Sequence, residues 1–295
     1  MSSTIRSPRD IRTIAGQYPV TTYFVLTFAI SWAGAFAVVL PHLIRHESLP
    51  KMVGILMFPV MLLGPSFTGL FLTRKVDGKR GVQDLFRRLG RWRIYPCWYA
   101  ALLIAPILVL TVLFFLKTFV SPSFAPNRFL AGILFGVPAG FLEEIGWMGF
   151  AFPKLCLQRN ALSSSVILGV LWSIWHLPVM DYLGTATPHD AYLPSFFVVF
   201  GVAMTAIRVL IAWAYTNTRS VLIAQLMHVS STGSLVIFSP PRVTAGQEVM
   251  WYGIYGITLW IIVAIITMRS IGWGEEADVI PGRRTPAQKP SRYSR

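Results

Sequence analysis

The chain has 295 residues, of which 54% are hydrophobic and only 13% are charged, and its mean hydropathy is +0.59. Soluble domains carry roughly 25% charged residues, so this composition excludes an ordinary soluble fold. The formal net charge of +14 could suggest nucleic-acid binding. However, almost all of the basic residues lie between and beyond the apolar runs, and there is neither an RNA-binding signature nor Cys/His finger spacing. We therefore expect an all-α polytopic protein surrounded by membrane lipids, with no nucleic-acid partner.

About eight apolar runs approach or exceed the roughly 20 residues that a helix needs to cross a bilayer. We expect a basic arm over residues 1–19, one transmembrane helical bundle over 20–268, and a basic, disordered tail over 269–295. The first run is longer than the apolar core of a signal peptide, so we expect it to remain as an anchor. In chain order the predicted spans are Val20–Leu40, Met52–Thr73, Trp98–Leu116, Phe129–Phe152, Ala161–Met180, Ser195–Tyr215, Val221–Phe238 and Met250–Met268.

The distribution of lysine and arginine predicts the orientation of the chain. The arm contains Arg6, Arg9 and Arg12, and residues 74–93 contain eight further basic residues, whereas Asp181–Tyr192 contains none. Basic loops stay on the cytoplasmic side. With an even number of spans, both termini are expected in the cytoplasm, and Gln83–Arg93 is expected to lie along the inner leaflet as an amphipathic helix. Cys97 and Cys156 fall near cytoplasmic helix ends and are expected to be free thiols.

Five ionisable residues fall inside the predicted spans, namely Glu143, Glu144, His176, Arg208 and His228. Ionisable groups in the hydrocarbon layer cost a few kcal/mol or more each, so they are candidates for function. Adjacent residues on a helix diverge by about 100°, so Glu143 and Glu144 cannot face the same point. One of the two carboxylates is expected to face a cavity while the other forms a structural pair.

The remaining signals are two pairs of residues that lie one helical turn apart, Trp172 with His176 and His228 with Thr232. If the fourth helix continues to about Leu155, Glu143 and both histidines reach similar depths near the middle of the bilayer. A carboxylate and two imidazoles there could activate water and bind an oxyanion, which is the chemistry of peptide hydrolysis without a covalent nucleophile. The same groups would also suit zinc binding or proton transport, while a serine protease is disfavoured because no G-x-S-x-G string is present.

These three strings resemble the CPBP family of intramembrane glutamate proteases, which includes the type II CAAX prenyl endopeptidases and bacterial bacteriocin-processing or immunity homologues. The family pattern is E-E-x-x-x-R, then an aromatic residue followed by x-x-x-H, then H-x-x-x-N, and the resemblance covers a core over residues 129–238. It implies that Glu143 activates water with His176, that His228 helps to bind the oxyanion, and that Trp172 supports the site. It also implies a peptide or membrane-protein substrate and catalysis without a metal or other cofactor.

Two positions depart from the family pattern. Met148 stands where the family has arginine, and Thr232 stands where it has asparagine. The Thr232 hydroxyl can still donate one hydrogen bond to an oxyanion. Because Glu144 then lacks its usual partner, we hypothesise that Arg208 pairs with it. The departures favour one alternative, a non-catalytic binding or immunity protein. A less favoured alternative is a proton-coupled transporter in which Glu143 and His176 carry protons.

Overall fold

A computed structural model describes residues 15–269 as helices and connecting loops, with no strand in that range. The arginines expected in the arm and the tail expected to be disordered lie outside these residues, except for the boundary residue Arg269. Within the described range, seven helical segments are long and apolar enough to cross a membrane. The expectation of an all-α polytopic membrane protein is therefore confirmed.

The helices follow the predicted spans in chain order. The second span is continued by further helix into the basic segment, so that Lys51–Leu89 forms one run of 39 residues. The helices are α2 (Pro19–Ile44), α3 (Lys51–Met61), α4 (Leu63–Leu72), α5 (Gly78–Leu89), α6 (Cys97–Ala100), α7 (Ile104–Phe119), α8 (Ile133–Gly146), α9 (Phe152–Leu155), α10 (Ala161–Trp175), α11 (Leu193–Thr218), α12 (Val221–Phe238) and α13 (Ala245–Met268).

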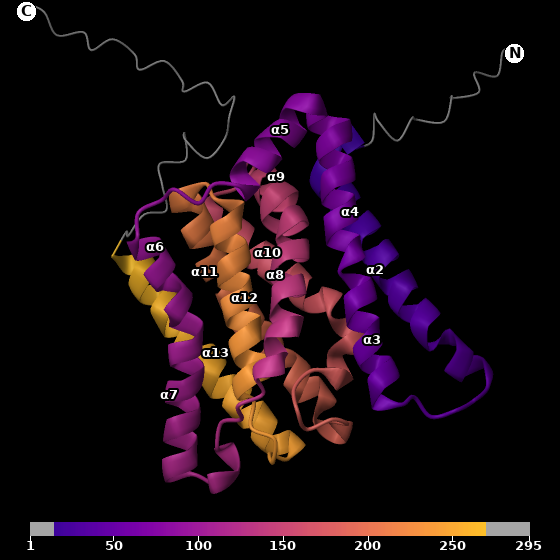
Figure 1. The fold of residues 1–295 in the computed structure, drawn as a ribbon, viewed down its shortest axis with the longest axis vertical. Coiled ribbons are helices and arrows are strands. Elements are labelled where there is room, and N and C mark those ends of the chain that lie inside the picture. Colours follow the sequence, from indigo (N-terminus) through magenta and orange to yellow (C-terminus); the bar gives the residue numbers. More distant parts are fainter. Residues whose placement is uncertain (1–14, 270–295) are drawn as a thin grey trace, which may run out of the picture.

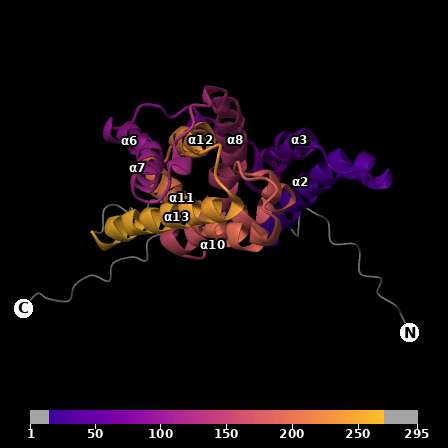
Figure 2. The same cartoon turned by 90° about the horizontal axis from the view of Figure 1, so that it is seen from below.

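Successive passes alternate in direction, so α2 begins and α13 ends toward the same end of the bundle (Figure 1). We call the end that carries α5 and residues 74–93 the basic end. The opposite end carries the connections from α2 to α3, from α7 to α8, from α10 to α11 and from α12 to α13, and we call it the loop end. Seen from the loop end, α2 and α3 lie to one side of the group formed by the later helices (Figure 2).

The fifth pass is shorter than expected. The sequence predicts a span over Ala161–Met180, but α10 ends at Trp175 and the chain continues as a 3-10 helix over Leu177–Tyr182. Pro178 explains the break, because its nitrogen carries no hydrogen to donate to the carbonyl of Ile174. The 15 residues of α10 span only about 22 Å at about 1.5 Å per residue. The expected eight spans are thus seven full-length segments and one short helix among the described residues.

Glycines allow α8 and α12 to approach closely, and this contact is the most extensive between any two helices of the described chain. A Cβ atom on Gly136 would lie 2.9 Å from the Cα atom of Gly233. A Cβ atom on Gly140 would lie 2.6 Å from Cγ2 of Val229 and 2.7 Å from the carbonyl oxygen of Gln225. Small residues spaced by one turn are a common basis for helix packing in membranes. Here they set the distance between the helix that carries the glutamates and the helix that carries His228.

We predict that Gly140→Ala lowers the melting temperature in detergent micelles, because the added methyl group must push α8 away from α12. Overpacking of this kind costs about 1–3 kcal/mol. Gly253→Ala is the matched control, since its Cβ atom would meet only Cγ1 of Val199 at an ordinary 3.6 Å while gaining the same helix propensity. Equal melting temperatures for the two variants would contradict the close-packing role of Gly140.

Candidate active site

The fourth pass continues to the depth that the sequence argument requires. After α8, a π-helical turn over Trp147–Ala151 leads into α9, so the helix reaches Leu155. Such π-helical turns are frequently found at functional sites. The guanidinium of Arg88 donates to the carbonyl oxygen of Gly149 within this turn at 3.0 Å. The basic segment therefore stabilises the turn that follows the two glutamates.

Glu143 is fully buried, and its two carboxylate oxygens have different surroundings. Oε2 accepts hydrogen bonds from the indole N–H groups of Trp147 at 3.0 Å and Trp172 at 2.7 Å. Oε1 has no hydrogen-bond partner among the described residues. Sequence reasoning missed the donor role of Trp147, although its position four residues after Glu143 was a usable signal. The two indoles fix the carboxylate and leave one oxygen to bind something other than the described protein.

Glu144 faces a different set of partners. Its Oε1 atom lies 2.6 Å from a terminal guanidinium nitrogen of Arg208 and 2.7 Å from Nδ1 of His228. Arg208 is also fully buried, and its guanidinium carbon lies 4.2 Å from the centroid of the Trp172 ring. The hypothesised ion pair is therefore present. Because Arg208 comes from α11, the pair joins α8 to α11.

Both histidines use Nδ1 to fix the orientation of their rings. Nδ1 of His176 lies 2.8 Å from the carbonyl oxygen of Trp172, and since a carbonyl only accepts, Nδ1 must carry the hydrogen. By the same reasoning, Nδ1 of His228 donates to the Glu144 carboxylate. Nε2 is then the remaining nitrogen of each ring. The Trp172 ring packs edge-on against both imidazoles, with centroid separations of 5.3 Å and 5.1 Å.

One cavity of about 290 Å³ joins the predicted catalytic residues. Glu143, His176, His228 and Thr232 all line it, together with Trp172. Glu144 and Arg208 do not line the cavity and instead support its wall from behind. None of the hydrogen bonds between described residues uses the Thr232 hydroxyl, whereas the hydroxyls of Ser231 and Ser234 bond their own helix. In residues 15–269, no three His, Cys, Asp or Glu side chains form a group that could hold a metal ion.

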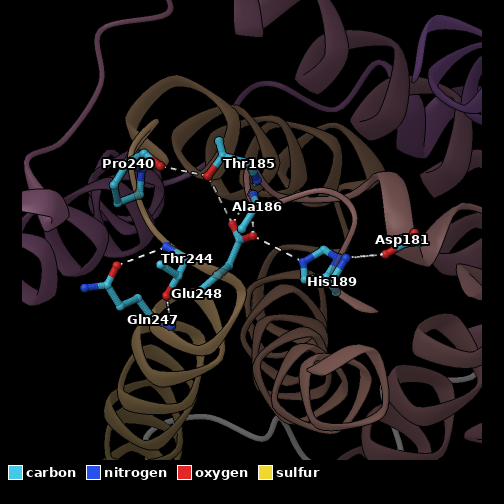
Figure 3. Close-up of polar contacts among 8 residues, drawn as sticks. All are labelled: Asp181, Thr185, Ala186, His189, Pro240, Thr244, Gln247 and Glu248. Atoms are coloured by element: carbon cyan, nitrogen blue, oxygen red, sulfur yellow. Dashed lines mark hydrogen bonds and ion pairs between the residues drawn. The ribbon is translucent and has the colours of Figure 1, made fainter. Parts of the chain in front are cut away.

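A second polar cluster lies at the loop end of the cavity, and we call it the Glu248 clasp (Figure 3). Glu248 lies near the start of α13. Its carboxylate accepts hydrogen bonds from the backbone N–H groups of Thr185 at 2.9 Å and Ala186 at 2.8 Å. His189 bridges two acids, with Nε2 at 3.2 Å from Glu248 and Nδ1 at 3.1 Å from Asp181. Residues 182–185 line the cavity. The clasp therefore fixes the wall of the cavity mouth to α13.

The clasp also explains the unusual conformation of Gly184. The sequence alone did not predict this cluster. Gly184 has φ +78, and a Cβ atom there would lie 2.4 Å from Oε1 of Glu248. Only glycine accepts both the conformation and the close approach. Sequence reasoning used the segment Asp181–Tyr192 only for its lack of basic residues. Nothing in the local spacing links His189 to an acid that follows it by 59 positions.

We predict strong coupling between Glu144 and Arg208 in a double-mutant cycle. Glu144→Gln or Arg208→Gln alone leaves one buried charge without its partner, which typically costs 3–5 kcal/mol. The double variant removes both charges and should therefore lose much less than the sum of the two single losses. The free energy of unfolding in detergent micelles, measured for all four proteins, gives the coupling. Additive losses would show that the pair contributes no interaction energy.

We further predict that the clasp makes stability depend on pH. Burial opposes charging of the His189 ring, but its hydrogen bonds to Glu248 and Asp181 raise the pKa of His189 above its ordinary value of 6.5. A raised pKa in the folded state means that the stabilisation is complete below pH 6.5 and is lost as the pH rises through the raised value. The melting temperature of the wild type should therefore fall over this range.

The matched variants for this prediction replace two histidines by the same residue. His189→Asn should flatten the alkaline fall in melting temperature, because the titrating group is gone. His46→Asn changes an exposed histidine with φ 53, a conformation that asparagine tolerates. This control should keep the wild-type profile. Identical pH profiles for the two variants would refute the clasp as the source of the dependence.

Comparisons with known proteins bear on the helices that carry this site. Residues 125–233 match the sequence model described as "Type II CAAX prenyl endopeptidase Rce1-like". The chain is also 23% identical over 223 residues to "CAAX prenyl protease 2" of Methanococcus maripaludis, and this alignment covers 70% of the chain and 78% of the relative. The matched residues include α8, α10, α11 and most of α12, and with them both glutamates, Arg208, His228 and, directly after α10, His176. The resemblance noted from the sequence is thus confirmed, and over residues 125–233 the chain carries the sequence pattern of the Rce1-like type II CAAX prenyl endopeptidase family.

Proposed function

We propose that this protein is a multi-pass, membrane-embedded endopeptidase that hydrolyses a peptide bond in a membrane-associated peptide or protein. One observation carries the proposal: Oε1 of Glu143, buried and without a hydrogen-bond partner among the described residues, belongs to a side chain that shares one cavity with two fixed imidazoles. The relative named "CAAX prenyl protease 2" supports the same reaction class. The substrate class is a peptide or membrane protein, and lipids surround the bundle.

In the proposed mechanism, Glu143 and His176 activate the attacking water. Nδ1 of His176 is occupied by the Trp172 carbonyl, so Nε2 of the neutral ring accepts a hydrogen bond from water. Oε1 of Glu143 accepts the second hydrogen and takes the proton as the water oxygen attacks the carbonyl carbon of the substrate. The protonated carboxyl group then delivers that proton to the leaving amine nitrogen. The two indole N–H groups hold the carboxylate in position throughout.

His228 and Thr232 stabilise the oxyanion in this proposal. Nδ1 of His228 is fixed by the Glu144 carboxylate, and Nε2 donates a hydrogen bond to the oxyanion when the ring carries both protons. The Thr232 hydroxyl, which makes no hydrogen bond to the described residues, supplies a second donor. Donors placed in advance around a developing oxyanion are among the largest contributors to such catalysis. Arg208 and Trp172 act as positioning residues.

We also propose that both termini lie in the cytoplasm. The even number of alternating passes supports this orientation, as do the eight basic residues of segment 74–93 at the basic end. Positively charged segments next to spanning helices remain on the cytoplasmic side.

We predict that Glu143→Gln abolishes cleavage while the fold is retained. The amide cannot accept the proton of water, and loss of a general base typically lowers the rate by 10²–10⁴-fold. The measurement compares peptide fragments by mass spectrometry in cells that produce the wild type or the variant. Fragments that depend on the wild type should disappear. A chelator should leave cleavage by the purified wild type unchanged if the reaction needs no metal.

The matched control is Glu47→Gln, which makes the same change at an exposed site in the loop between α2 and α3. It should retain full cleavage, and both variants should keep the melting temperature of the wild type within a few degrees. Wild-type fragments from the Glu143→Gln protein would rule out the proposed base. A cellular phenotype that survives replacement of Glu143, His176 and His228 would favour the non-catalytic binding protein instead.

A further inference from the structure

The cavity reaches the surface at the loop end, where residues of two connections line it. Its outer lining includes Asn127 and Phe129 from the connection of α7 to α8, and Leu183 and Thr185 from the connection of α10 to α11. Phe129 is 46% exposed, so the lining continues to the molecular surface. Segment 74–93, α5 and α9 contribute no residue to the lining. The exposed part of the cavity lining therefore lies at the end of the bundle opposite the basic end.

The two ends differ strongly in charge. Segment 74–93 carries eight lysine and arginine residues against Asp77 and Asp84. The four loops of the loop end contain only three basic residues between their flanking helices, Arg45, Arg128 and Arg242. The longest of these loops, which contains the clasp, contains none. This asymmetry follows the rule that basic loops stay in the cytoplasm, and it places the loop end on the other side of the membrane.

From these two observations we infer that the cavity takes its substrate from the extracytoplasmic side of the membrane, as an uncharged, apolar segment of a peptide or membrane protein. The inference rests on the proposed endopeptidase function, because that function makes the bound segment a substrate. Apart from Glu143 and the two histidines, the lining side chains are uncharged, and aromatic and aliphatic groups such as Phe58, Phe200 and Val236 predominate. A charged segment would lose its hydration there without gaining a partner.

A native cysteine can report the side of the membrane on which the basic end lies. Cys97 is exposed at the start of α6, next to the basic segment, while Cys156 is buried. No other cysteine occurs in the sequence. A small, membrane-impermeant anionic methanethiosulfonate can therefore report the orientation of Cys97 in the full-length wild type. Cysteines introduced at the loop end, in a background with Cys97→Ser and Cys156→Ser, report the other side and the cavity.

The experiment treats intact bacterial spheroplasts, and then permeabilised ones, with this reagent. Ala191→Cys, at an exposed loop position, reports the side of the membrane, and Val236→Cys, in the cavity lining, reports access to the cavity. Both should react in intact spheroplasts, whereas Cys97 of the wild type should react only after permeabilisation. Phe129→Cys replaces Val236→Cys if the latter variant is not produced in the membrane.

Each other outcome overturns the inference. Reaction of Cys97 but not of Ala191→Cys in intact spheroplasts would show that the cavity faces the cytoplasm. Reaction of Ala191→Cys without reaction of either cavity cysteine would show that the cavity is closed from that side. The readout does not depend on catalysis, so it remains valid if Glu143→Gln shows that the protein is not a protease. Conversely, loss of cleavage in Glu143→Gln would support the endopeptidase function without showing the direction of access, which the cysteine labelling determines.

Discussion

The positions of the other residues of the candidate site depend on the buried ion pair between Glu144 and Arg208. Both side chains are fully buried, and together they join α8 to α11 while the same carboxylate orients His228 on α12. A single charge there would cost several kcal/mol in hydrocarbon, so neither residue is tolerable without the other. Arg208 also packs against the face of Trp172. Through that ring, the structural pair is connected to the indole N–H that holds Glu143.

The two adjacent glutamates therefore divide two tasks that one residue could not perform. Glu144 binds Arg208 and His228 through Oε1 and so connects three helices. Glu143 receives only the two indole donors, at Oε2, and its Oε1 atom belongs to a side chain that lines the cavity. The divergence of adjacent helical side chains makes this division possible within one turn. The π-helical turn that follows lets α8 pass directly from the glutamates into α9 without a break in the span.

Much of this arrangement follows from the sequence, because costly residues inside apolar runs are conspicuous. The passes, the two histidines and the pairing of Arg208 with Glu144 could be predicted, since an arginine in hydrocarbon demands an acid. Pro178 could have predicted the end of α10, but the span Ala161–Met180 was predicted from hydropathy alone. The Glu248 clasp could not be predicted. It depends on a loop of irregular backbone meeting the start of α13, and no periodic spacing encodes such a contact.

The shortness of α10 has a consequence for how the proposed hydrolytic site obtains its water. A helix of 15 residues falls about 8 Å short of a hydrocarbon layer about 30 Å thick. The remaining depth is taken up by the irregular segment that starts at His176, whose backbone groups tolerate that depth only beside protein or water. In the proposed mechanism, this short helix lets water from the loop end approach the His176 imidazole without a dedicated channel.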